Sequence, residues 1–135
     1  MKKKIKHISL KSLKKKAWDL QSEYIRRVER GICFTCRSKR NWKEMDCGHY
    51  IHGNWMDFIL INLHCQCTFC NRLKHGNFGL YAERMIAEYG EKVVMDLREY
   101  SEKKENKDKK LNIFELENLI LSYKQKLKDL SNPCV

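Results

Sequence analysis

Two pairs of cysteines in this sequence have the spacing of a metal site. Two residues separate the cysteines within each pair, and 30 residues lie between the pairs. The four residues are Cys33, Cys36, Cys67 and Cys70. Zinc prefers four ligands in a tetrahedron, and a turn of this spacing directs two sulfur atoms to one point. Because four thiolates leave no open coordination position, we expect a structural zinc ion; a redox-active pair would need only one such turn.

The segment between the two pairs carries side chains suited to acid–base chemistry. Residues 46–54, DCGHYIHGN, contain His49 and His52, two of the five histidines in the chain. A neutral imidazole can accept a proton from water near neutral pH. Asn71 directly follows Cys70, the last cysteine of the two pairs, and its side-chain oxygen is a ligand that Mg²⁺ and Mn²⁺ accept. Phosphodiester cleavage needs such a base and cation, although a plain surface hairpin and a helix cap would explain the same residues.

The other cysteines and histidines have simpler explanations. Cys47 and Cys65 occupy alternating positions along expected strands, so we expect small buried apolar side chains rather than metal ligands. Cys134 is left without a role. His64, beside cysteines inside an expected strand, is predicted to be structural, whereas His75 is predicted to contact phosphate.

Two strands and several helices must position these side chains. Apolar residues recur three and four apart over residues 10–29, which predicts an amphipathic helix that Gly31 can end. The expected strands cover residues 44–51 and 58–66, and further helices are expected from 71, over 80–90, over 91–100 and from 112. Asn112 and Glu115 have the spacing of a capping box at the start of the last helix.

These elements predict one α+β domain with helical extensions in a chain of 135 residues. A basic N-terminal helix occupies residues 1–30, and a zinc-bound core with its following helices occupies residues 31–100. Residues 101–110, SEKKENKDKK, are almost wholly charged and predict a flexible linker or a loosely held helix end. Residues 111–135 predict a C-terminal helix whose apolar stripe suits either dimerisation or packing on its own domain.

The positive charge is concentrated in the first third of the chain. Residues 1–45 hold 15 Lys and Arg against four acidic residues, and residues 46–135 hold 13 of each, so the net charge of +11 arises before residue 46. This imbalance favours an anionic partner over a generic solvated surface. Basic residues near the candidate site predict phosphate contacts without readout of base sequence. They are Arg26, Arg27, Arg30, Arg37, Lys39, Arg40, Arg72 and Lys74, joined by His75.

Two tryptophans flank the expected hairpin. Trp42 and Trp55 could stack on unpaired bases or pack within the fold. We favour packing, because tryptophan is mostly buried in folded proteins.

Nothing in the sequence predicts a membrane-bound or secreted protein. No apolar run approaches the ~20 residues of a membrane span, and the basic N-terminus lacks the apolar stretch of a secretory signal. Paired cysteines with zinc spacing suit a reducing compartment better than disulfides do. We therefore expect a cytoplasmic protein.

The motifs around the second cysteine pair resemble the H-N-H (His-Me finger) nucleases. In that pattern a histidine on a first strand precedes an asparagine that starts a second strand, a C-x-x-C turn, and a final His or Asn that opens a helix. His49, Asn62 and Asn71 match these positions. More widely, the motifs CFTC, GHYIHGN, NLHCQCTFCNRLKHGN and LYAERM, within residues 10–100, resemble the NinG/Rap family of phage recombination endonucleases.

This resemblance implies a zinc-stabilised ββα-metal core, similar to a treble clef, with flanking helices. It implies an endonuclease that cleaves branched DNA, such as Holliday junctions and D-loops, with Mg²⁺ or Mn²⁺ in the cytoplasm of a bacterial host. His49 would act as the general base that activates water, Asn71 would bind the catalytic cation, and Asn62 would hold the loop that orients the base. A homodimer would present two sites to the two strands cut in a four-way junction.

One position departs from the H-N-H pattern. The family usually carries Asp or His directly before the base as a second metal ligand, and this chain has Gly48 there. Because side chains alternate along a strand, Asp46 and His52 share the face of the missing ligand. We favour Asp46, since Gly53 can bend the chain beside the histidine. The departure keeps open the hypothesis of a non-catalytic zinc-stabilised DNA-binding module. Two further alternatives are a nicking H-N-H endonuclease with little branch preference and a protein-interaction adaptor.

Overall fold

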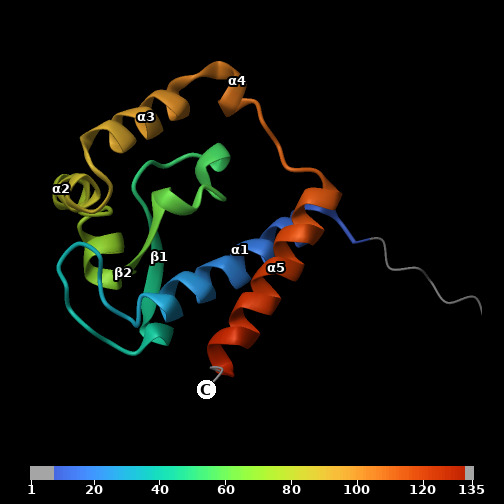
Figure 1. Ribbon diagram of the computed structural model, residues 1–135, viewed down its shortest axis with the longest axis horizontal. Helices are drawn as coiled ribbons and strands as arrows, with labels where there is room; N and C mark the ends of the chain where they lie inside the picture. Colours follow the sequence, from blue (N-terminus) through green and yellow to red (C-terminus); the bar gives the residue numbers. More distant parts are fainter. Residues whose placement is uncertain (1–7, 133–135) are drawn as a thin grey trace, which may run out of the picture. The chain divides into compact units, whose positions relative to one another are not determined.

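The chain folds into two compact units, each described here separately. The structure is a computed structural model that describes residues 8–132 (Figure 1). One unit spans Ser22–Lys110, and the other joins the described part of Met1–Gln21 to that of Leu111–Val135. The elements in chain order are α1 (Leu10–Val28), β1 (Met45–His49), β2 (Leu63–Cys67), α2 (Phe78–Tyr89), α3 (Glu91–Glu102), α4 (Lys104–Lys107) and α5 (Ile113–Ser131). The expectation of a mixed helical and antiparallel fold is confirmed.

The helical unit pairs the first half of α1 with α5. The apolar stripe of α5 is buried there; its residues are Leu116, Ile120, Tyr123 and Leu127. The Tyr123 hydroxyl donates to Oε1 of the buried Gln21 at 3.1 Å. At the start of α5, the Asn112 side chain accepts from the Glu115 backbone, and the Glu115 carboxylate accepts from the Asn112 backbone. The capping box is therefore confirmed, and self-association stays a prediction.

Helix α1 ends at Val28, and the turn that follows contains the predicted glycine in a left-handed conformation. Gly31 has φ of +66° and donates its N–H to the Arg26 carbonyl at 3.0 Å. A Cβ atom at this position would lie 2.0 Å from the carbonyl oxygen of Arg40, so a larger residue would push the chain apart. The sharp turn sends the chain directly into the first cysteine pair.

An antiparallel hairpin forms the centre of the larger unit. Strands β1 and β2 pair in a register that runs from Met45 opposite Cys67 to His49 opposite Leu63. Both strands are shorter than the predicted ranges 44–51 and 58–66. Beyond β1, the side chain of Asn62 pairs with the backbone of Ile51 in place of a strand. It accepts from the Ile51 N–H at 2.8 Å and donates to the Ile51 carbonyl at 2.9 Å. The residues directly before β2 form a short 3₁₀ turn.

The segments after the hairpin form a hydrophobic core against it. The buried residues of this core are Phe34, Tyr50, Met56, Tyr81, Met85, Val94 and Leu97. These residues come from the first cysteine turn, the loop after β1, α2 and α3. Gly90 separates α2 from α3, as predicted. The helix predicted from residue 71 differs: a π-helical turn, η4, covers Phe69–Leu73, and α2 begins only at Phe78.

The charged segment 101–110, predicted to be a flexible linker or a loosely held helix end, contains helical residues. Its first two residues complete α3, and α4 forms a further helical turn. Asn106 is buried and donates to the Tyr100 carbonyl at 2.9 Å, which connects the segment to α3. Within residues 8–132, no helix has the length and apolar character of a membrane span.

Candidate metal centre and candidate active site

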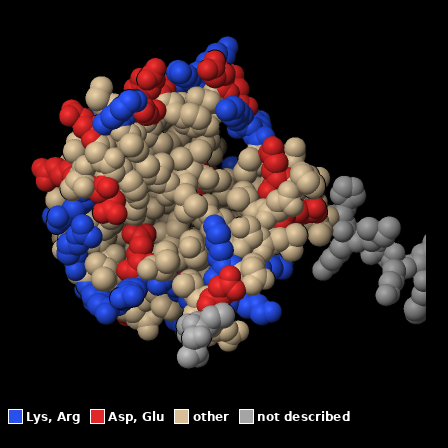
Figure 2. Space-filling model, viewed as in Figure 1, with Lys and Arg blue, Asp and Glu red and all other residues tan. Residues whose placement is uncertain are grey.

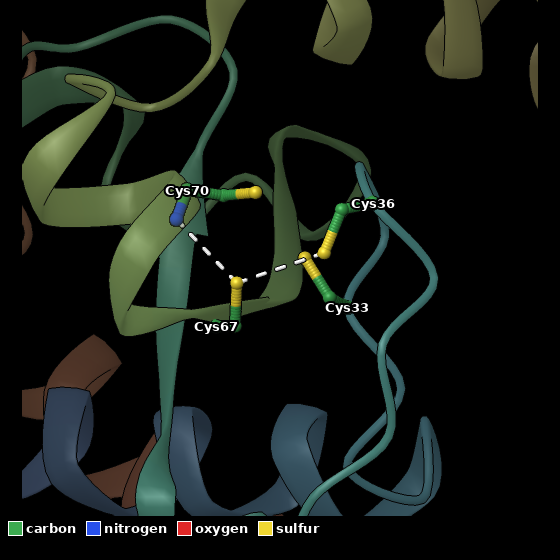
Figure 3. Close-up of side chains that lie close together, drawn as sticks. All are labelled: Cys33, Cys36, Cys67 and Cys70. Carbon is green, nitrogen blue, oxygen red and sulfur yellow. Dashed lines mark hydrogen bonds between the residues drawn. The ribbon is translucent and has the colours of Figure 1, made fainter.

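Four cysteine side chains meet at one point beside the hairpin (Figure 3). They are the predicted set, Cys33, Cys36, Cys67 and Cys70, and their sulfur atoms all lie within 4.8 Å of one another. Cys33 and Cys36 come from the turn after α1, and Cys67 and Cys70 come from the end of β2 and from η4. This cluster can hold a metal ion such as zinc, and four soft thiolate donors match the chemistry that zinc prefers.

Neighbouring polar groups and burial change the pKa values of the cysteine thiols in this cluster. Hydroxyl groups contact two of the sulfurs, from Thr35 to Cys33 at 3.2 Å and from Ser38 to Cys36 at 3.1 Å. Burial alone would raise the pKa of the Cys36 thiol, but hydrogen bonds from Ser38 lower it to about 6. Burial raises the pKa of the Cys67 thiol to about 12. Binding of a metal would therefore displace protons from this cluster.

The remaining described cysteines are buried and lie outside the cluster, as predicted. Cys47 and Cys65 stand directly opposite each other in the hairpin. Burial raises the pKa of both thiols, to about 12 for Cys65, so both stay protonated at neutral pH. Cys134 lies outside the described residues.

The predicted base lies at the end of β1 and has an acidic partner. His49 Nε2 lies 3.1 Å from Asp57 Oδ1, and both side chains are about four-fifths buried, with 19% and 23% exposed. The ring centroids of His49 and His52 are 5.6 Å apart. Asp57 follows the short turn Asn54–Met56, which buried Met56 anchors in the core. Sequence reasoning missed Asp57, because it lies eight positions after the histidine, beyond irregular chain.

Asn62 fixes the backbone that follows the base. Its side chain is fully buried and forms the two hydrogen bonds with Ile51 described above. Its carbonyl also accepts the Tyr50 N–H at 2.9 Å. Asn62 therefore holds the backbone of the two residues that follow His49, Tyr50 and Ile51, through three hydrogen bonds.

A second polar group forms around Asp46. Asn71 Nδ2 donates to Asp46 Oδ2 at 3.0 Å, and Arg72 makes two hydrogen bonds to the same carboxylate, at 2.9 and 2.8 Å. The hydrogen bonds and charge of Asp46 raise the pKa of Arg72. Two predicted ligand residues, Asp46 and Asn71, thus meet directly, whereas His52 lies beside His49.

The absence of a side chain at Gly48 has a structural cause. A Cβ atom there would lie 1.9 Å from Oε1 of Gln66, whose fully buried side chain covers this position. The Gln66 amide donates to the Thr35 hydroxyl at 3.2 Å and to the Gly76 carbonyl at 3.0 Å. It therefore links the first cysteine turn to the turn after η4, and a ligand at position 48 would break this link.

His64 is structural, as predicted. Its Nδ1 lies 2.9 Å from the Glu29 carboxylate and its Nε2 lies 2.8 Å from the Tyr89 hydroxyl. Its ring stacks on Phe34 with centroids 3.7 Å apart. Both ring nitrogens thus hold neighbouring segments to the hairpin, namely the turn after α1 and helix α2.

Basic side chains gather over the loop that joins α1 to β1, at the lower left of Figure 2, while both charges alternate over α3 and α4. Exposed residues among the predicted phosphate contacts are Arg30, Arg37, Lys39, Arg40, Arg72, Lys74 and His75. Arg26 instead donates to the carbonyls of Trp42 and Met45, and its guanidinium lies over the Trp42 ring. Trp55 donates to the Ser101 carbonyl at 3.0 Å. Both tryptophans therefore have packing partners.

Comparison with known proteins identifies relatives across nearly the whole chain. The family model described as Bacteriophage Lambda NinG protein matches residues 1–133. Protein ninG of Escherichia phage lambda is 30% identical over 136 residues, which cover 96% of this chain and 64% of that protein. Protein ninG of Escherichia phage 933W is also 30% identical, with coverage of 96% and 65%. The chain thus spans about two-thirds or less of the length of these relatives, and no solved structure is significantly similar to it. The match of the family model shows that this chain belongs to the NinG family.

Proposed function

We propose that this protein is a metal-dependent endonuclease of the H-N-H (His-Me finger) type that cleaves branched DNA, such as Holliday junctions and D-loops. The observation that carries the proposal is the placement of His49, with Asp57 on its Nε2, at the end of a hairpin anchored to the four-cysteine cluster. The same hairpin carries Asp46, whose carboxylate accepts a hydrogen bond from Asn71, the residue after Cys70. The resemblance of the motif set to the NinG/Rap endonucleases supports the assignment.

In this proposal His49 is the general base. An imidazole nitrogen of His49 takes the proton from an attacking water, and Asp57 contacts the ring at Nε2. Asp57 keeps the ring in one orientation and stabilises the imidazolium that forms. Asn62 is a positioning residue, since it holds the backbone of Ile51 just beyond the base.

Asp46 and Asn71 would hold the catalytic cation. Both offer oxygen ligands, which Mg²⁺ and Mn²⁺ prefer, and half a turn of the Asn71 carboxamide presents its oxygen in place of its nitrogen. When bound, the cation neutralises charge that builds on the phosphate oxygens during cleavage. Asp46 is favoured over His52, because the structure joins Asp46 to Asn71 and places His52 beside the base.

The basic surface supports DNA as the partner. Exposed basic residues lie on both sides of the hairpin in sequence. Three precede it, Arg37, Lys39 and Arg40, and two follow Cys70, Arg72 and Lys74. Contacts of this kind bind phosphates without reading sequence and weaken steeply with salt. We propose selection of DNA shape, action in the cytoplasm of a bacterial host, and a homodimer that presents two sites to a junction.

A cleavage assay separates this proposal from its alternatives. Zinc-loaded protein with Mg²⁺ or Mn²⁺ is expected to cut a labelled four-way junction and a flap faster than linear duplex of the same sequence. Equal cutting of linear duplex would favour a nicking endonuclease with little branch preference. Tight junction binding without cleavage in any divalent cation would favour a binding module, and no DNA affinity at low salt would favour a protein-interaction adaptor.

Loss of the carboxylate at position 57 is expected to slow cleavage. Asp57→Asn removes the negative charge that stabilises protonated His49 while keeping the shape of the side chain. The rate at saturating DNA should fall by about tenfold or more, with an unchanged dissociation constant for the junction. Asp57→Glu should restore part of the rate. Equal rates for the wild type and Asp57→Asn would remove Asp57 from the mechanism.

The second cation ligand can be identified from the metal dependence. Asp46→Asn is expected to raise the Mn²⁺ concentration needed for half-maximal cleavage by about tenfold or more. His52→Gln should leave that concentration within about twofold of the wild-type value, since loss of a non-ligand has no direct effect on the cation. Arg72→Gln serves as the control for loss of the ion pair with Asp46. The opposite pattern, with the increase in His52→Gln alone, would assign the ligand to His52.

A further inference from the structure

Two large apolar side chains project from η4, the turn that also carries the last zinc ligand. Phe69 is 54% exposed and Leu73 is 71% exposed. They are four residues apart, so they lie on the same side of the turn. Phe78, the next exposed aromatic residue along the chain, instead stacks on Tyr50 with ring centroids 5.2 Å apart.

The exposure of Phe69 and Leu73 follows from the cysteine pair itself. Cys70 must point inward to reach the other three sulfurs and is only 1% exposed. Phe69 and Leu73 on the same short turn remain exposed. Neither exposed position requires an apolar side chain, so contact with a partner would explain the choice.

Basic residues lie close to these two side chains. Lys74 Nζ lies 5.4 Å from the centroid of the Phe69 ring. Arg72, between the two apolar residues in sequence, pairs with Asp46 but keeps 69% of its side chain exposed, and His75 is exposed two residues after Leu73. Exposed apolar side chains next to basic ones match a polyanion that offers flat apolar surfaces. Nucleic acid bases are such surfaces, but in an intact duplex their faces are covered by stacking.

We propose that Phe69 and Leu73 form a wedge that contacts bases unstacked at a DNA branch point, while Arg72 and Lys74 bind the adjoining phosphates. This inference depends on the proposed function only because it takes DNA as the partner. On linear duplex the cations still bind, but the apolar side chains remain in water. At a junction or flap the exposed base faces cover Phe69 and Leu73, so the wedge adds affinity for branched DNA alone.

Binding measured without cleavage tests the wedge. The experiment uses zinc-loaded His49→Ala protein without added divalent cation, a fluorescent four-way junction and a linear duplex of the same length. Adding Phe69→Ala and Leu73→Ala together should weaken junction binding by about tenfold, the worth of one stacked base. Duplex binding should change by less than about twofold. A 2-aminopurine base at the branch point should report unstacking with the parent protein and lose that signal with the double variant.

A matched control exists in the chain. Phe114 and Leu121 on α5 are exposed to a similar degree, at 70% and 65%. Replacing both with alanine removes the same side-chain types and should leave junction selectivity unchanged. Phe69→Trp should retain it, because a larger ring still stacks. The wedge is overturned if the Phe69/Leu73 variant keeps the parent selectivity, which would assign the patch to a protein partner, or if both DNAs lose affinity equally. This experiment measures binding and not cleavage, so its result is independent of the nuclease proposal. If the wild-type protein bound junctions through the wedge but did not cut them in the cleavage assay, only the nuclease proposal would be refuted.

Discussion

Replacing Cys67 with serine is expected to abolish zinc binding and unfold most of the unit that spans Ser22–Lys110. A structural zinc site contributes about 10–16 kcal/mol of binding free energy, which is folding free energy when no site exists in the unfolded chain. Typical domains have only about 5–15 kcal/mol of total stability. The hairpin that Cys67 closes has five residue pairs, so it depends on the ion more than on its own pairing.

The measurement is zinc content by atomic absorption, together with thermal unfolding followed by circular dichroism. Cys65→Ala is the matched control, since Cys65 lies two residues away on the same strand and is also buried, but is not one of the four clustered residues. It should retain one zinc ion per chain and lose about 1–2 kcal/mol of stability, as a small core truncation does. A Cys67→Ser protein with full zinc content and an unchanged melting temperature would show that the four sulfurs do not form the site.

Removing the imidazole at position 49 is the substitution with the largest expected effect on the proposed reaction. General base catalysis contributes about 10²–10⁴-fold to rate, so His49→Ala should lower junction cleavage by about that factor. Junction affinity should persist, because the basic side chains that bind phosphate are unchanged. Added imidazole should restore part of the activity by filling the space of the lost ring.

The control for this substitution is a second histidine, His75, which is exposed. His75 lies on the turn after η4 and is predicted to contact phosphate rather than water. His75→Ala should weaken DNA binding modestly and leave the rate at saturation within about twofold of wild type. Retention of full activity by His49→Ala, or an equal loss of activity in both variants, would contradict the assignment of His49 as the base.

Local patterns in the sequence were enough to predict the metal centre. A cysteine pair with two intervening residues forms a turn that directs both sulfurs inward, so Cys33, Cys36, Cys67 and Cys70 could be grouped without a model of the whole fold. The capping box at Asn112 is local in the same way. The burial of Cys47 and Cys65 followed from alternation along strands.

The features that were missed depend on contacts distant in sequence or on irregular backbone. Asp57 reaches His49 through a loop whose path is set by buried Met56, and no periodicity marks it. Gln66 covers Gly48 because of the hairpin register, which the sequence alone leaves open. The end of the strands and the connection of segment 101–110 to α3 each involve one buried amide, in Asn62 and Asn106. Side chains of this kind are common in loops, so composition does not distinguish them.

The decisive experiment is a crystal structure of the zinc-loaded protein bound to a four-way junction, with a divalent cation that does not support cleavage. We expect a cation on the oxygens of Asp46 and Asn71 that also contacts a backbone phosphate. We also expect the His49 ring within one water molecule of the same phosphorus. A phosphate bound far from His49, or a cation bound away from Asn71, would refute the proposed active site.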